Sequence, residues 1–180
     1  MMRELRFFEE TVMANKKDRM FTIVLLCIYG LILVWIVLLK ASSPAELKYL
    51  PCARSLNLVP FHYDTEVNSH LSETLLNVAV FVPLGLYLGM LGVRWWKTIL
   101  VGFAASVLFE AAQYAFSIGA ADVTDLLTNT AGTAAGVGLY LLLRRVFKHT
   151  DRLHRVLNIL FCVGTGLFLA FAVFLIVVNS

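Results

Sequence analysis

Five long runs of apolar residues follow one another along this chain, separated by polar connections. A helix needs about 20 apolar residues to cross the ~30 Å hydrocarbon core of a bilayer, and each run is close to that length. The pattern therefore predicts an all-α protein, a polytopic transmembrane bundle with five membrane-spanning helices. The runs cover residues 20–39, 74–93, 98–116, 122–143 and 156–178.

The connections between the runs complete the predicted organisation. Residues 1–19 mix acids and bases around apolar residues, which is typical of either an amphipathic interfacial helix or a flexible cytoplasmic segment. Residues 40–73 form one long loop, and residues 144–155 form a short basic one. The first run is longer than the apolar core of a cleaved signal peptide, so we expect an uncleaved anchor.

Lysine and arginine are distributed unevenly between alternate connections, and this predicts the orientation because cytoplasmic loops carry the excess. Most of them lie before the first run, between the second and third, and in residues 144–155. The long loop holds only Lys40, Lys48 and Arg54. We therefore expect the N-terminus inside, the C-terminus outside and the long loop on the extracytoplasmic side.

Composition narrows the class of protein further. Hydrophobic residues make up 59% of the chain and charged residues only 15%, which excludes an ordinary soluble domain. The net charge of +3 comes from cations that flank the apolar runs, where lipid head groups meet them, so no nucleic-acid partner is expected. The three cysteines show no disulfide or metal spacing. No metal site is predicted, and the sequence leaves any cofactor unknown.

Polar and small residues follow one face of the fourth run. Asp122, Asp125, Asn129, Gly132 and Gly136 recur at steps of three and four, which places them on one side of a helix. The residues of this seam are polar where the helix begins and are glycines further along. The two glycines form a small-xxx-small pattern, which predicts that another helix approaches closely.

Glu110 and Gln113 lie inside the apolar third run. A carboxylate in hydrocarbon costs at least a few kcal/mol, so such residues usually face a protein interior or a watery cavity. At ~1.5 Å per residue, Glu110, Asp125 and Asn77 all reach the outer half of the membrane, from three different helices. We therefore expect one shared polar pocket there, open to the outside.

Each of these residues also has a structural interpretation. Glu110 is either a hydrogen-bonded structural acid or a general acid/base with a raised pKa. Asp122 is equally well an ordinary helix N-cap, and Asn129 an interhelical hydrogen-bonding group. Arg54, in the segment that contains Asn57, either anchors at the interface or forms a fork for an anionic group.

Other polar positions are expected to be structural. His62 and His70 are interpreted as loop residues, and His149 and His154 as part of a solvated basic face. The first and last runs carry no charge, so both are expected to be peripheral and exposed to lipid.

Four motifs in fixed order carry a family resemblance. They are Arg54-Ser-Leu-Asn57-Leu-Val-Pro60-Phe61, Asn77-Val-Ala-Val-Phe81-Val-Pro83-Leu84-Gly85, Glu110-Ala-Ala-Gln113 and Asp122-Val-Thr-Asp125-Leu-Leu-Thr-Asn129-Thr-Ala-Gly132. Together they resemble the VanZ-like family of bacterial integral membrane proteins, over about residues 54–140 and a core of residues 54–145. Many relatives carry an arginine before the last motif. Gly119, Ala120 and Ala121 stand there instead, so the role of that arginine is not carried over.

The resemblance implies a multi-pass protein of the bacterial cytoplasmic (plasma) membrane. The family takes its name from an accessory protein of glycopeptide resistance, associated with teicoplanin. A wider relationship links it to membrane enzymes that act on lipid head groups or lipid-linked saccharides. The expected partners are therefore membrane lipids or lipid-linked cell-wall intermediates, and the oligomeric state stays open.

The leading hypothesis is a lipid head-group hydrolase or transferase at the outer leaflet. Glu110 serves as acid/base, and Asp125 with Asp122 orients it or a metal ion. The substrate-binding residues are Arg54 for a phosphate, with Asn57, Asn77, Gln113 and Asn129 for other polar groups. The alternative is a non-catalytic membrane protein that binds or shields an envelope lipid or antibiotic.

Overall fold

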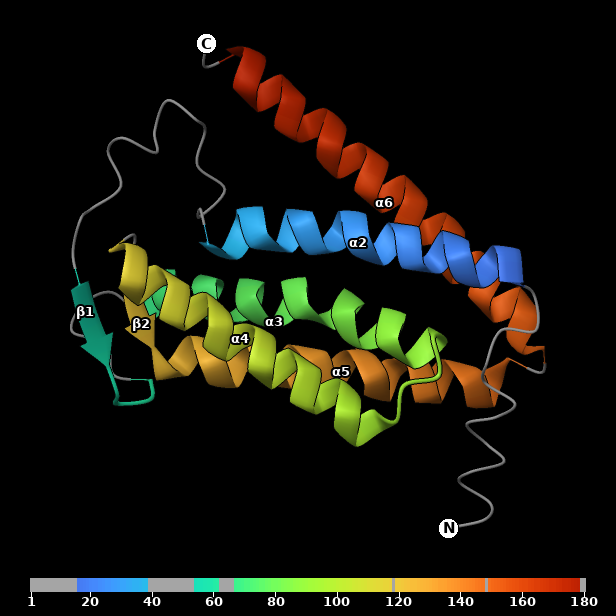
Figure 1. Cartoon of the computed structure of the whole chain (residues 1–180), viewed down its shortest axis with the longest axis horizontal. Helices are drawn as coiled ribbons and strands as arrows, with labels where there is room; N and C mark the ends of the chain where they lie inside the picture. Colours follow the sequence, from blue (N-terminus) through green and yellow to red (C-terminus); the bar gives the residue numbers. More distant parts are fainter. Residues whose placement is uncertain (1–15, 39–53, 62–66, 118, 148, 179–180) are drawn as a thin grey trace.

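The computed structural model describes residues 16–38, 54–61, 67–117, 119–147 and 149–178 (Figure 1). Within them, five helices are long and apolar enough to cross a membrane, which confirms the predicted polytopic bundle. They are α2 (Lys16–Leu38), α3 (Val67–Met90), α4 (Trp95–Phe116), α5 (Val123–Val146) and α6 (Thr150–Val178). Most of the expected N-terminal segment, the loop residues 39–53 and His62 lie outside the described residues.

Two helices begin earlier than their apolar runs. α3 starts at Val67, so Glu73, which was expected in the long loop, lies on a helix. α6 starts at Thr150, which puts His154 on its first turns. The interpretation of His154 as a solvated residue is wrong: its side chain is 2% exposed, and its Nε2 lies 2.9 Å from the hydroxyl oxygen of Tyr140.

A short strand pair, which the sequence did not predict, joins one end of the bundle. β1 (Arg54–Asn57) and β2 (Gly119–Asp122) run parallel, with Arg54 opposite Gly119 and Asn57 opposite Asp122. A parallel pair needs a long crossover connection, and here α3 and α4 supply it. Figure 1 shows the pair beside the end of α4 and the start of α5. We call this the strand end of the bundle, and the opposite end the basic end.

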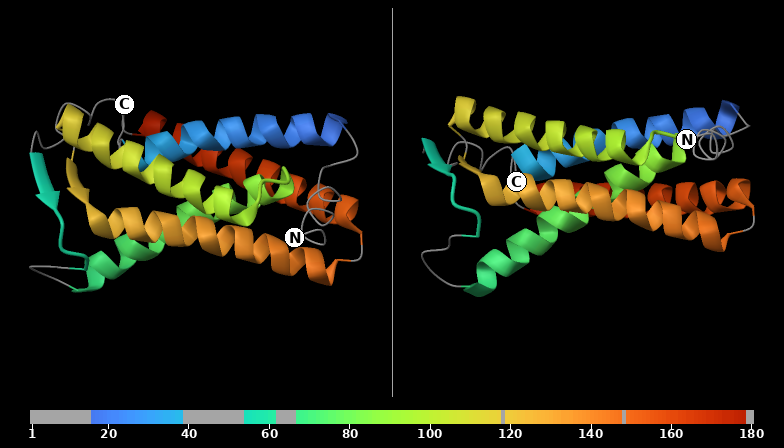
Figure 2. Two further views of the ribbon diagram at one scale, coloured as in Figure 1. Left: turned by 60° about the horizontal axis from the view of Figure 1, so that its bottom comes forward. Right: turned by 90° about the horizontal axis from the view of Figure 1, so that it is seen from below.

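The helices α3 and α5 pack with their backbones in close contact, as the glycine spacing predicted. A Cβ atom at Gly132 would meet the carbonyl oxygen of Val78, and one at Gly136 would meet that of Val82. A Cβ atom at Gly85 would in turn meet the backbone of α5. This approach brings the first half of α3 beside the polar start of α5. Figure 2 shows the two helices crossing in two further views.

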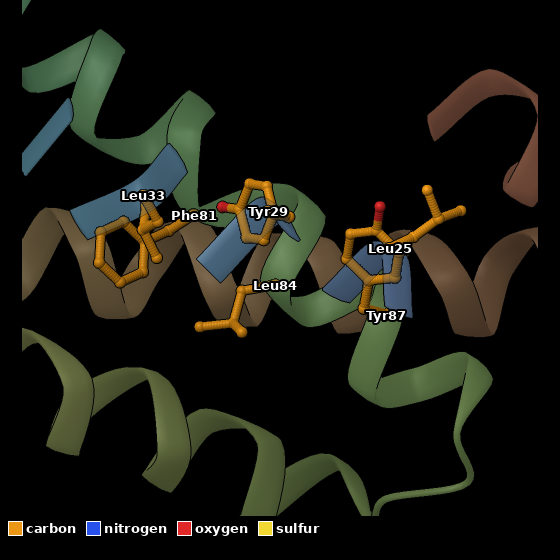
Figure 3. Close-up of a cluster of buried hydrophobic side chains, with 6 residues drawn as sticks. All are labelled: Leu25, Tyr29, Leu33, Phe81, Leu84 and Tyr87. Carbon is orange, nitrogen blue, oxygen red and sulfur yellow. The ribbon is translucent and has the colours of Figure 1, made fainter. Parts of the chain in front are cut away.

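The first span is not peripheral, contrary to expectation. α2 packs on α3 through a buried apolar cluster, drawn in Figure 3: Leu25, Tyr29, Leu33, Phe81, Leu84 and Tyr87. The hydroxyl of Tyr29 also donates a hydrogen bond to the carbonyl oxygen of Val80. α6 does remain at the periphery, because four of its five buried residues lie in its first nine positions and Figure 1 shows it diverging from α2 towards the C-terminus.

Candidate functional site

The described cations gather at one end of the bundle, and four of the described carboxylates lie at the other. The described carboxylates of the strand end are Glu73, Glu110, Asp122 and Asp125. The lysines and arginines whose side chains the structure describes lie at the basic end: Lys16, Lys17, Arg19, Arg94, Lys97, Arg144, Arg145, Arg152 and Arg155. The helix order therefore does bring the predicted acids to one end of the molecule.

Glu110, Asp122 and Asn57 form one hydrogen-bonded group at the strand end. Oε2 of Glu110 accepts the backbone N–H of Asp122 at 2.8 Å, and Nδ2 of Asn57 donates to Oδ2 of Asp122 at 3.1 Å. Oδ1 of Asp122 accepts the backbone N–H of Thr124 at 2.6 Å, so Asp122 is the N-cap of α5. This group ties α4, β1 and α5 together.

A recess of about 290 Å³ lies beside this group. Its walls come from the segment after β1, the last turns of α4 and the first turns of α5. Apart from Asn57, Glu110 and Asp122, the lining residues are Leu56, Leu58, Val107, Ala111, Tyr114, Ala121, Val123 and Leu126. Almost no polar surface faces the recess, because the three polar side chains bond to one another and to backbone. We call it the apolar recess.

A second recess, of about 250 Å³, lies between α2, α3, α4 and α5. It is lined by Ile36, Val37, Glu73, Leu76, Asn77, Gln113 and Asp125, and much of its surface is polar. We call it the polar recess. Nδ2 of Asn77 donates to Oδ1 of Asp125 at 2.7 Å, and Nε2 of Gln113 donates to the carbonyl oxygen of Val37 at 3.0 Å.

The predicted residues therefore do not line a single pocket. Glu110 and Asp122 line the apolar recess, whereas Gln113 and Asp125 line the polar one. The reason is helical geometry: three residues advance a helix by about 300°, so each later side chain points about 60° away from the earlier one. The contact between α4 and α5 separates the two directions.

Asn129 lines neither recess. Its side chain is 1% exposed, and its Nδ2 donates to Oγ of Ser106 on α4 at 2.9 Å. The hydrogen bond joins two helices below the polar end of the seam. This is the interhelical contact that the structural interpretation of Asn129 predicted.

Among the lining residues that the sequence analysis did not single out, Glu73 and Val37 contact or face its predicted residues. Glu73 precedes Asn77 by four positions on α3, a spacing that would have indicated it if the helix had been extended beyond its apolar run. Val37 comes from α2, which was expected to take no part. Arg54 begins β1, but its side chain lies outside what the structure describes, so its role stays a prediction.

The arrangement offers carboxylates and amides as functional groups. Among the described residues, no three His, Cys, Asp or Glu side chains gather closely enough to hold a metal ion. The catalytic and binding roles of the predicted residues stay predictions.

Comparison with known proteins places the site in a family context. The sequence model of the VanZ/LLP1 family matches residues 26–144. "Protein VanZ" of Enterococcus faecium is 35% identical over 118 residues, which cover 64% of this chain and 71% of that protein. No solved structure matches the chain. The family match begins within α2 and ends within α5, so it contains every described residue that lines the two recesses.

Proposed function

The chain belongs to the VanZ/LLP1 family, and from that premise we propose that it acts at the outer leaflet of the bacterial cytoplasmic membrane on an envelope lipid or a lipid-linked cell-wall intermediate. One observation carries the proposal. An apolar recess and a polar recess lie at one end of the bundle, and α4 and α5 contribute side chains to both. A lipid has the same two parts, a hydrocarbon chain and a polar head group.

The charge distribution supports the outer-leaflet assignment. Cytoplasmic loops carry the excess of lysine and arginine, so we place the basic end inside and the strand end outside. A cysteine at Leu58, which is 64% exposed, tests this in a background without Cys27, Cys52 and Cys162. We expect it to react with a membrane-impermeant maleimide on intact cells. Reaction only after permeabilisation would reverse the assignment.

Asp125 is the acid that we propose for chemistry in the polar recess. Asn77 fixes its orientation by donating to Oδ1, and Glu73 supplies a second carboxylate in the same recess. In a hydrolysis or transfer, one of the two groups acts as a carboxylate and takes the proton of the attacking hydroxyl, and the other, in its protonated form, gives its proton to the leaving oxygen. Glu110, the acid first considered, holds the start of α5 through the N–H of Asp122, which favours a positioning role for it.

A second candidate function is non-catalytic binding or shielding of an envelope lipid or antibiotic. The observation that favours it is that Glu110, Asp122 and Asp125 each accept a hydrogen bond from within the protein. Carboxylates held in this way recognise a ligand without any need to exchange protons with it.

Mass spectrometry of lipids separates the two candidates. Purified protein is incubated in liposomes of envelope lipids, and changed head groups are measured for wild type, Asp125→Asn and Glu110→Gln. The catalytic function predicts turnover by wild type and a loss of about 100-fold or more in Asp125→Asn. Saturable binding of unchanged lipid supports the binding function. Neither turnover nor binding above protein-free liposomes would contradict both.

We also propose that this activity contributes to glycopeptide resistance of the teicoplanin type. Expression of the wild-type chain in a susceptible bacterium is expected to raise the inhibitory concentration of teicoplanin, and Asp125→Asn is expected not to. An equal rise with both forms would separate resistance from the polar recess.

A further inference from the structure

The apolar recess opens on the outside of the bundle and not towards its interior. On α4, Ser106 and Gln113 are buried inside the bundle, and each is followed directly by a residue that lines the recess. Consecutive side chains of a helix point about 100° apart, so Val107 and Tyr114 face another direction, and they are 40% and 46% exposed. The recess therefore faces the surrounding lipid. The other exposed residues of its lining are Leu56, Leu58 and Ala111.

The recess lies at the depth of hydrocarbon chains. α4 is long and apolar enough to cross a membrane, and Val107 precedes its last residue, Phe116, by nine positions. At ~1.5 Å per residue this is a distance of about 14 Å, close to the ~15 Å thickness of one half of the hydrocarbon core. From Tyr114 to Val107 the lining therefore follows α4 through the half of the membrane that adjoins the strand end. In the proposed orientation this half is the outer leaflet.

The recess is formed without a ligand, because its wall after β1 is fixed to the start of α5. Nδ2 of Asn57 donates to Oδ2 of Asp122, and the backbone N–H of Phe61 donates to Oγ1 of Thr124, both at 3.1 Å. The small side chain of Ala121, on β2, leaves the space beside this wall open. An empty hollow deprives its lining of dispersion contacts, which a ligand would supply.

The lining matches a hydrocarbon chain better than a head group. Almost no polar surface faces the recess, and none of the described residues that line it is basic. A phosphate or a sugar would lose its hydrogen bonds to water there without gaining others. Ligand pockets have volumes of about 300–1,000 Å³, so a recess of about 290 Å³ suits a slender ligand such as one chain.

We propose that the apolar recess is a docking site for one hydrocarbon chain, which enters sideways from the outer leaflet. This inference rests on the proposed function and names the class of ligand. The ligand is a lipid whose chain stays in the bilayer while its head group lies at the strand end. A free head group, or a polar compound without a hydrocarbon chain, is a poor ligand for this recess.

Native mass spectrometry of the full chain in detergent tests the proposal. Phosphatidylglycerol is added to delipidated protein, and the lipid that survives washing is measured. Wild type is expected to retain the lipid, and an excess of water-soluble glycerophosphoglycerol is expected not to displace it. Ala111→Trp, which fills the recess, is expected to retain about 10-fold less, which corresponds to about 1.4 kcal/mol.

Ala104→Trp is the matched control. Ala104 precedes Ala111 by about two helical turns on the same face of α4, is exposed and lines neither recess. Its retention of lipid is expected to equal that of wild type. Val107→Trp fills the recess from another position, and thermal unfolding checks that each variant is folded.

A photoreactive diazirine on the retained chain gives the direction of entry. A diazirine near the head group is expected to label Tyr114, and one at mid-chain is expected to label Val107. The reverse order would overturn entry from the outer leaflet.

Equal retention by wild type and both filling variants would mean annular lipid only, and would overturn the inference. If wild type still changed head groups in the liposome assay, the proposed function would then stand without this docking site. A wild-type protein that neither retains nor changes a lipid removes both.

Discussion

The two recesses lie at the same end of the bundle and share α4 and α5, and yet their chemistry is opposite. In the apolar recess, Glu110 accepts the N–H of Asp122 and Asn57 donates to the side chain of Asp122, and the acids present almost no polar surface. In the polar recess, the side-chain nitrogens of Asn77 and Gln113 donate to oxygens of Asp125 and Val37. Oε1 of Gln113 is buried and has no hydrogen-bond partner among the described residues. The destination of each hydrogen bond, and not the mere presence of an acid, decides what a recess can bind.

The largest expected effect comes from Gly132→Val, which removes one recess and spares the other. A side chain at Gly132 would collide with the carbonyl oxygen of Val78, so α3 must move away from α5 and Asn77 from Asp125. We expect a loss of about 3 kcal/mol in stability, measured by chemical unfolding in detergent, together with loss of the lipid turnover proposed for the polar recess.

The apolar recess should survive this change, because the described residues that line it include none of α3. Photocrosslinking of an acyl chain to a probe at Ala111 measures this. Gly138→Ala is the control, since a Cβ atom there meets nothing within 4 Å. A loss of crosslinking in Gly132→Val as large as the loss of turnover would mean that the recesses are not independent.

Smaller effects, opposite in kind, are expected for Glu110 and Asp125, two acids of the strand end that line different recesses. Glu110→Gln weakens the hydrogen bond to the N–H of Asp122, so it should lower stability by about 1–2 kcal/mol and keep the lipid turnover. Asp125→Asn should lose the turnover with a smaller change in stability. Unfolding and mass spectrometry of lipids on the same samples check both. The reverse pattern would return the functional role to Glu110.

The smallest effect concerns the hydrogen bonds of Asp122 that connect β1 to the start of α5. Asp122→Ala removes the N-cap and the bond from Asn57, and we expect a loss of about 1 kcal/mol. Asn57→Ala should cost less, since it leaves the cap in place. The double variant measures the coupling, for which we expect about 0.5 kcal/mol or more. Strict additivity would show that Asn57 and Asp122 do not interact.

Local patterns predicted those features that a single helix defines. The five apolar runs, the Asp122 cap and the glycine seam with Asn129 all follow from the spacing of residues along one segment. The extension of α3 to Glu73 was missed because hydropathy marks the part of a helix that lies in hydrocarbon and not its polar first turns.

Features that depend on distant segments could not be predicted in this way. The β1–β2 pair joins Asn57 to Asp122, and neither short strand has an alternating pattern of its own. Val37 enters the polar recess because α2 packs on α3 through Tyr29 and its neighbours. A seam shows which side chains share a face, but only the packed neighbours divide that face into two recesses.

The most direct test of the account is a structure of the protein in nanodiscs of bacterial envelope lipids. A hydrocarbon chain is expected beside Ala111 and Leu126 in the apolar recess. We expect a polar atom of a lipid head group within about 3 Å of a side chain that lines the polar recess. A head group in the apolar recess, or two empty recesses with lipid only on the other helix faces, would contradict the account.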